Sequence, residues 1–114
     1  MQGDPGVLEL LNDVLTAELT AINQYFVDAK MLDSWGLRRL GKHFYEDSID
    51  EMKDADELIE RILYLEGVPN LQRLGSVRVG ETVVEKLTAA LDLERAAVAR
   101  LNAGVATCTA SAQM

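Results

Sequence analysis

The feature that most constrains the fold of this chain is a pattern of apolar residues at alternating spacings of three and four, which occurs three times. Such spacing places the side chains on one face of an α-helix, and a long helix of this kind must bury that face. The sequence therefore predicts an all-α bundle of three long helices. The three apolar seams consist of Leu8, Leu11, Leu15, Glu18, Ile22, Tyr25, Ala29 and Leu32, of Leu37, Leu40, Phe44, Asp47, Glu51, Asp54, Leu58 and Leu65, and of Val84, Leu87, Leu91, Glu94, Val98, Leu101, Val105 and Cys108.

Capping signals indicate where the first two helices begin and end. Asp4 precedes Pro5, and an Asp N-cap followed by proline at the first helical position is typical of a helix start. Trp35-Gly36 supplies a stop for the first helix, and the second seam ends within residues 66–69.

Residues 66–81 contain Gly67, Pro69, Gly75 and Gly80 and are too interrupted to form a helix. Extended at about 3.3 Å per residue, they are long enough to run the length of a bundle. We therefore expect a crossover loop between the second and third helices.

The third helix is expected to begin at the capping box formed by Thr82 and Glu85. After Gly104 the sequence consists mostly of small residues with little surface to bury, so residues 104–114 are expected to form a weakly structured tail. The chain has 114 residues and 48% hydrophobic composition, which is enough for one core, and residues 1–114 are expected to form a single domain.

The charge and cysteine content exclude several classes of function. A net charge of −8, with no stripe of basic residues, argues against a nucleic-acid partner and favours cations. The single Cys108 cannot form an internal disulfide, and residues 1–5 do not resemble the start of a signal peptide. No apolar stretch approaches the roughly 20 residues of a membrane span. We therefore expect a reduced, cytoplasmic protein.

Each apolar seam carries a glutamate near its middle: Glu18, Glu51 and Glu94. A carboxylate among apolar residues costs several kcal/mol unless it is compensated, and mid-helix positions of antiparallel helices meet at one level. Three such acids predict a shared interior site, where protons or a metal cation offset their repulsion. The alternative is that the seams are wider and the acids lie at solvated edges. Bundles that bind two metal ions place a histidine three residues after such a glutamate, whereas Asp54 follows Glu51 here.

With these residues in view, the sequence resembles bacterioferritin from Met1 to about residue 105. The resemblance is carried by residues 18–26, 34–37, 48–52 and 60–72. It implies a four-helix bundle with a long crossover between helices 2 and 3, a short fifth helix and usually 24 subunits. Since no fourth helix is recognised, we expect a short form with three long helices of the ferritin-like bundle, lacking the fourth and fifth helices.

The family's subunits pair about two-fold axes, where one b-type haem is held by a methionine from each side. The resemblance makes Met52 this ligand. Independently of it, spacing places Leu19, Asn23 and Phe26 on one stripe of the first helix and Tyr45, Ile49 and Met52 on one stripe of the second. Together these stripes give the subunit a second apolar face. The alternative is that Met52 only fills a gap in the core, as methionines usually do. The expected walls of the haem pocket are Leu19, Ile22, Asn23, Phe26, Tyr45 and Ile49.

The di-iron centre of the family is matched only in part. Glu18, Glu51 and Glu94 correspond to three ligands, Asp54 stands where a histidine is expected, and the ligands of a fourth helix are absent. The one histidine of the chain, His43, is expected to be an ordinary surface residue. Half the ligands of a complete centre would have to come from another chain.

Three functions remain open at this point. The first hypothesis is a haem-binding protein, with haem b between two copies, acting in electron transfer or iron handling. The rival is an iron-storage ferroxidase whose carboxylate site is completed by another chain. The third is a structural subunit of a larger assembly. In each case something must cover the apolar groove where a fourth helix would lie: a second copy, a complementary subunit, or a rearranged three-helix core.

Overall fold

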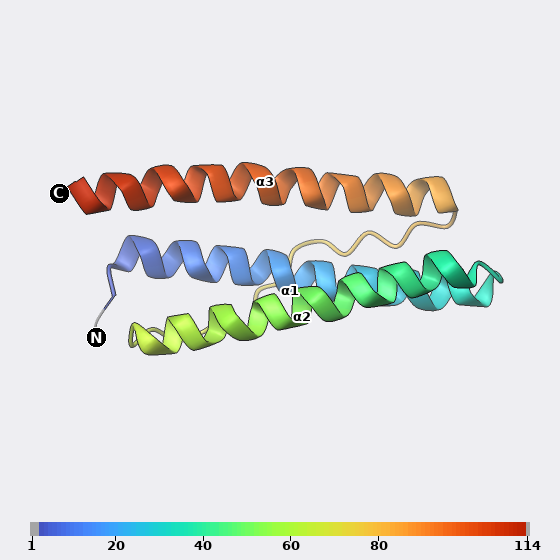
Figure 1. Cartoon of the computed structure of the whole chain (residues 1–114), viewed down its shortest axis with the longest axis horizontal. Coiled ribbons are helices and arrows are strands. Elements are labelled where there is room, and N and C mark those ends of the chain that lie inside the picture. Colours follow the sequence, from blue (N-terminus) through green and yellow to red (C-terminus); the bar gives the residue numbers. More distant parts are fainter. Residues whose placement is uncertain (1–2, 114) are drawn as a thin grey trace.

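The computed structural model describes residues 3–113 and consists of three long helices joined by one tight turn and one long connection (Figure 1). Helix α1 spans Pro5–Ser34, α2 spans Arg38–Tyr64 and α3 spans Val83–Gln113. No strand occurs within residues 3–113. The predicted all-α fold of three long helices is confirmed. Met1, Gln2 and Met114, which belong to the single domain that we expected, lie outside the described residues.

The capping signals act where the sequence predicted. The Asp4 carboxylate accepts a hydrogen bond of 2.7 Å from the N–H of Gly6, and Pro5 occupies the first helical position. At the other end of α1, Gly36 adopts a φ of +83°, in the left-handed region that glycine enters without strain. The chain therefore reverses direction within three residues, and α2 returns antiparallel to α1 (Figure 1).

Helices α1 and α2 form the best-packed part of the molecule, around two buried clusters. One cluster contains Leu15, Ala55 and Ile62; the other contains Ala21, Tyr25, Ala29, Leu32 and Phe44. The ring of Tyr25 packs edge-on against that of Phe44, with centroids 5.8 Å apart. The close approach of the two helices requires Gly41, because a Cβ atom there would lie 3.1 Å from the Ala29 carbonyl oxygen.

The long connection between α2 and α3 runs alongside α1. Its backbone N–H groups at Asn70, Gly75 and Arg78 donate to side chains of α1, over distances of 2.8 to 2.9 Å. The predicted long crossover is therefore present, and α1 satisfies part of its backbone hydrogen bonding. The acceptors are Asn12, Thr20 and Gln24.

Helix α3 begins as expected but is attached mainly through its first half. The Thr82 hydroxyl accepts from the N–H of Glu85, while the Glu85 carboxylate accepts from the N–H of Glu81 and not from that of Thr82. Within the first half, Lys86 and Ala89 are buried. The ammonium of Lys86 is fully buried and donates 2.9 Å to the Asp28 carboxylate, so an ion pair joins α3 to α1.

The third apolar seam is largely exposed. In the part of the chain that the structure describes, α2 and α3 both pack against α1 and not against each other. Two cavities, of about 840 and 450 Å³, lie between α2 and α3. The exposed members of the seam are Val84, Leu87, Leu91, Glu94, Val98, Leu101, Val105 and Cys108.

The expectation of a weakly structured tail differs from the structure, because α3 continues through Gln113. Alanine-rich sequence favours a helix, and Thr107 does not interrupt it because its hydroxyl donates to the Ala103 carbonyl of the preceding turn. Gly104 is buried against Leu10 of α1, so the helix keeps one contact with the bundle at this point.

None of the helices, over the described residues, has an apolar stretch long enough to cross a membrane.

The buried ion pair generates a stability prediction. Lys86→Met should lower the free energy of unfolding by about 3 kcal/mol, because it leaves the Asp28 carboxylate buried without its cation. The double variant Asp28→Leu/Lys86→Met should lose less of the free energy of unfolding than the single variant, because it leaves no unpaired charge in the core. Urea unfolding followed by circular dichroism would measure both. A Lys86→Met variant as stable as the wild type would contradict the stabilising role of the pair.

Candidate metal centre

Three carboxylates meet where the middle of α1 faces the middle of α2. Glu18 lies on α1, and Glu51 and Asp54 lie three residues apart on α2, so both project from one face of that helix. One oxygen of each carboxylate lies within 4.8 Å of the other two. Glu18 and Glu51 are partly buried and Asp54 is exposed, so the group lies at the edge of the bundle interior.

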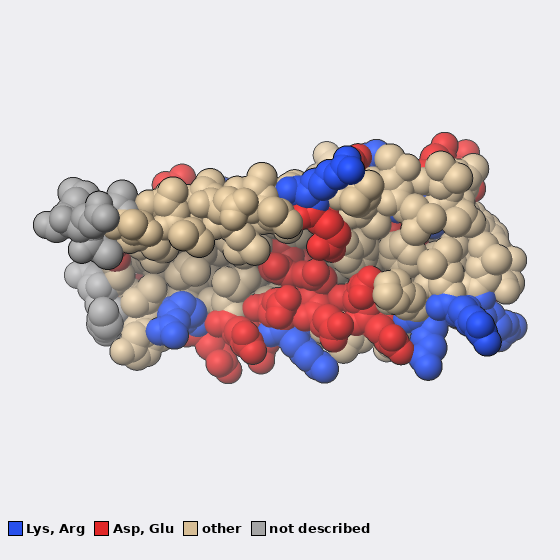
Figure 2. All heavy atoms as spheres, turned by 45° about the horizontal axis from the view of Figure 1, so that its top comes forward, with Lys and Arg blue, Asp and Glu red and all other residues tan. Residues whose placement is uncertain are grey.

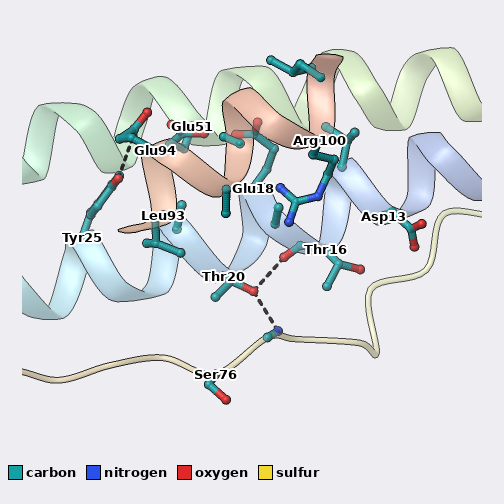
Figure 3. Close-up of a pocket in the computed structure, with 17 residues that line it drawn as sticks. Asp13, Thr16, Glu18, Thr20, Tyr25, Glu51, Ser76, Leu93, Glu94 and Arg100 are labelled. Atoms are coloured by element: carbon teal, nitrogen blue, oxygen red, sulfur yellow. Dashed lines mark hydrogen bonds between the residues drawn. The ribbon is translucent and has the colours of Figure 1, made fainter. Parts of the chain in front are cut away.

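Glu94, the fourth expected metal ligand, is not part of this group. It lies on α3, and its carboxylate accepts a hydrogen bond of 2.6 Å from the buried hydroxyl of Tyr25. It nevertheless lines the same cavity as Glu18 and Glu51, a space of about 230 Å³ between α1, α3 and the crossover (Figure 3). Three of the four expected residues are thus brought together, and the fourth stands across the cavity because α3 does not approach α2.

The cavity carries more negative charge than its own residues compensate. Burial, together with the nearby carboxylates of Glu94 and Asp54, raises the pKa of Glu51 to about 7. Burial and the Glu94 carboxylate also raise the pKa of Tyr25 above its usual range. Atom Oε2 of Glu18 is buried and has no hydrogen-bond partner among the described residues.

These observations fit a divalent cation. Hard cations such as Mg²⁺, Mn²⁺ and Fe²⁺ take carboxylate oxygens as ligands, and a cation would offset both the repulsion and the unpartnered oxygen. Glu18, Glu51 and Asp54 would hold it, with Glu94 nearest of the remaining acids that line the cavity. Histidine takes no part: His43 is exposed and pairs with Asp47 at 3.4 Å, as expected of a surface residue.

Many of the acids gather on one face of the molecule. Figure 2 shows them as a red cluster in the middle of this face, below the largely uncharged surface of α3, with a few further acids at its edges. Acids also line the groove between α2 and α3. The acids that line the two cavities of this groove are Glu18, Asp47, Asp50, Glu51, Asp54, Glu57, Glu60 and Glu94.

The residues expected to line a haem lie on the outward side of the α1–α2 pair. The side chain of Met52 is 52% exposed, which excludes the alternative that it fills a gap in the core. Phe26 and Tyr45 are 43% and 45% exposed, and their ring centroids are 6.4 Å apart. Asn23 is also exposed, whereas the remaining wall residues, Leu19, Ile22 and Ile49, are partly buried.

Residues 8–113 match the ferritin-like domain family. Bacterioferritin BfrA of Mycobacterium tuberculosis is 52% identical over 108 residues, which cover 95% of this chain and 68% of that protein. The bacterioferritin of Streptomyces coelicolor is 52% identical over 105 residues, covering 92% of this chain and 63% of that protein. The chain belongs to the bacterioferritin family. The expected resemblance is therefore confirmed, and this bacterioferritin-type chain spans about two thirds of the length of the mycobacterial relative.

Two features of this bacterioferritin-type site were not predicted from the sequence. Tyr25 was recognised only as a member of the first seam, although a hydroxyl in an apolar seam signals a buried hydrogen-bond partner. Arg100 lines the cavity beside Glu18 and was not singled out, because it lies next to the third seam and not within it.

The raised pKa of Glu51 predicts how the metal-free protein responds to pH. Because its pKa is about 7 in the folded state and 4.5 ordinarily, the folded protein keeps a proton that the unfolded chain loses between these pH values. Stability should therefore fall as pH rises from about 4.5 to about 7, and Glu51→Gln should remove about 1–2 kcal/mol of that fall. Urea unfolding at pH 5 and pH 8 in the presence of a chelator would measure the difference. Glu9→Gln, at an exposed position of α1, serves as the control and should leave the stability difference between pH 5 and pH 8 unchanged. Equal pH dependence in the wild type and Glu51→Gln would show that Glu51 is not the responsible group.

Proposed function

We propose that two copies of this chain hold one b-type haem between them, with Met52 of each copy as a ligand of the iron. The haem protein would act in electron transfer or iron handling in the cytoplasm, as a two-fold homodimer within a larger oligomer or in a complex with another subunit. The observation that carries the proposal is the half-exposed thioether of Met52 within an apolar face of the α1–α2 pair.

The surroundings of Met52 favour a flat apolar ligand. An apolar face that contains Phe26 and Tyr45 is costly to leave in water, and a second copy or a macrocycle would cover it. The one polar wall residue, Asn23, uses its side-chain N–H to donate 2.8 Å to the Leu19 carbonyl of its own helix. Because this N–H group is already hydrogen-bonded, Asn23 leaves less unsatisfied polarity on the apolar face.

The donor atoms determine the chemistry. When bound, haem supplies a one-electron redox couple. Thioether sulfur is a soft ligand, and two such ligands leave the iron no open position, so electron transfer suits this site better than oxygen chemistry. The protein's own part is to bring two Met52 side chains together and to exclude water with the aromatic rings.

The carboxylate group supports a second candidate function, that of an iron-storage ferroxidase. The specific observation in its favour is that Glu18, Glu51 and Asp54 meet beside an open groove between α2 and α3. Another chain that entered this groove would supply the ligands that a two-metal centre still needs. Iron bound at this partial di-iron site is compatible with haem on the opposite side of the α1–α2 pair.

The haem proposal predicts that the purified protein, supplied with haem, shows a b-type absorption spectrum. Met52→Leu should weaken haem binding by at least about tenfold, because leucine has no ligating atom. Met31→Leu removes the thioether beside Lys86 and should leave the spectrum unchanged. Spectrophotometric haem titration measures all three proteins. Equal spectra and affinities for wild type and Met52→Leu would refute Met52 as the ligand.

The ferroxidase proposal predicts that the purified assembly oxidises Fe²⁺ in air at least about tenfold faster than buffer does. Glu51→Gln should abolish the excess rate, because it removes a charged ligand at the centre of the carboxylate group. The initial rate of ferric absorbance measures this. Oxidation at the rate of buffer alone would eliminate a ferroxidase role for the assembly as purified.

A further inference from the structure

A single arginine stands among the acids of the candidate metal centre. Arg100 of α3 is partly buried, and it lines the cavity that Glu18, Glu51 and Glu94 also line. Figure 3 shows its guanidinium directed into this cavity, on the side of Glu18. Among the described residues that line the cavity, no other is basic.

The acids around Arg100 differ in whether they already have a partner. Asp13 also lines the cavity, but it is paired with Arg73 at 3.2 Å. Glu94 accepts the hydrogen bond from Tyr25. Oxygen Oε2 of Glu18, in contrast, is buried and has no partner within residues 3–113. Among the carboxylate oxygens of the described residues that line this cavity, the one that is both buried and without a partner is therefore on Glu18.

We propose that Arg100 is a resident counter-cation of the carboxylate centre, whose charge offsets that of Glu18 across the cavity and opposes a metal ion that binds there. The proposal rests on the metal site proposed above. Arginine suits this role because its long side chain is flexible, its charge is permanent and its guanidinium matches the geometry of a carboxylate. In the structure Arg100 forms no ion pair with a described residue, so its charge is not neutralised by another partner.

Arg100 lies at the outer side of this cavity. Arg100 lines both the inner cavity and the neighbouring surface recess that Asp13, Arg73 and Gly75 line. It therefore stands where the cavity opens toward solvent. From there its charge acts on an entering cation in two ways, by offsetting the negative charge of Glu18 and by repelling the cation directly. Arg100 thus lowers the metal affinity of the carboxylate centre.

The first experiment measures metal binding with Zn²⁺ as a redox-inert probe. Isothermal titration of the full chain should show that Arg100→Gln binds Zn²⁺ about three- to tenfold more tightly than the wild type, because the competing cation is gone. Arg100→Lys, which keeps the charge, should restore an affinity near that of the wild type. Arg95→Gln, an exposed arginine of the same helix, is the matched control and should not change it. An unchanged or weaker affinity in Arg100→Gln would overturn the proposal.

The second experiment tests the pairing without any metal. Arg100→Gln, Glu18→Gln and the double variant form a thermodynamic cycle in chelator-treated protein, followed by thermal unfolding. If the two side chains interact, Arg100→Gln should lower the midpoint in the wild-type background and have a smaller effect once Glu18 is neutral. Additive effects would overturn the proposal.

The two experiments separate failure of this inference from failure of the metal site. Zn²⁺ that binds the wild type and Glu18→Gln equally tightly would refute the metal centre, and the role of Arg100 with it. Zn²⁺ binding that depends on Glu18 but not on Arg100 would leave the metal centre in place and refute the role of Arg100.

Discussion

The close packing of α1 against α2 is the constraint on which the rest of the structure depends. Gly41 lets the two helices approach, and the two buried clusters hold them antiparallel along most of their length. Because the helices are antiparallel and similar in length, their middles lie at one level. Glu18 and Glu51 must therefore meet, and the same packing turns Met52 and Phe26 outward. One helix pair thus presents acids on one side and an apolar face on the other.

The parts of the structure that local chemistry determines could be predicted from the sequence. The start of α1 follows from Asp4 and Pro5, and its end follows from Gly36, because capping depends on neighbouring residues only. The meeting of Glu18 with Glu51 was also predictable, since it needs only the seam pattern and an antiparallel arrangement. The resemblance to bacterioferritin strengthened both inferences and supplied the proposed role of Met52, which the seam pattern alone could not.

The parts that depend on distant contacts could not be predicted. Glu94 has the same place in its seam as Glu18, yet it lies apart from the carboxylate group because α3 packs on α1 and leaves a groove beside α2. The burial of Lys86 depends on Asp28, 58 residues away in sequence, so no local pattern reveals it. The helical end of α3 was missed because small residues were taken as a sign of little structure, although alanine favours a helix even where it buries little surface.

The crossover determines the axial position of α3 relative to α1. Its N–H groups donate to Asn12, Thr20 and Gln24 at successive levels of α1, so its axial register is defined at three points. A slip of one residue would move each donor by about 3.3 Å and break all three bonds. Since the crossover leads directly into α3, this register sets how far α3 is advanced along the bundle. An irregular segment with no partner strand thereby aligns Glu94 with the hydroxyl of Tyr25, and a shorter or longer connection would place a different turn of α3 beside the carboxylates.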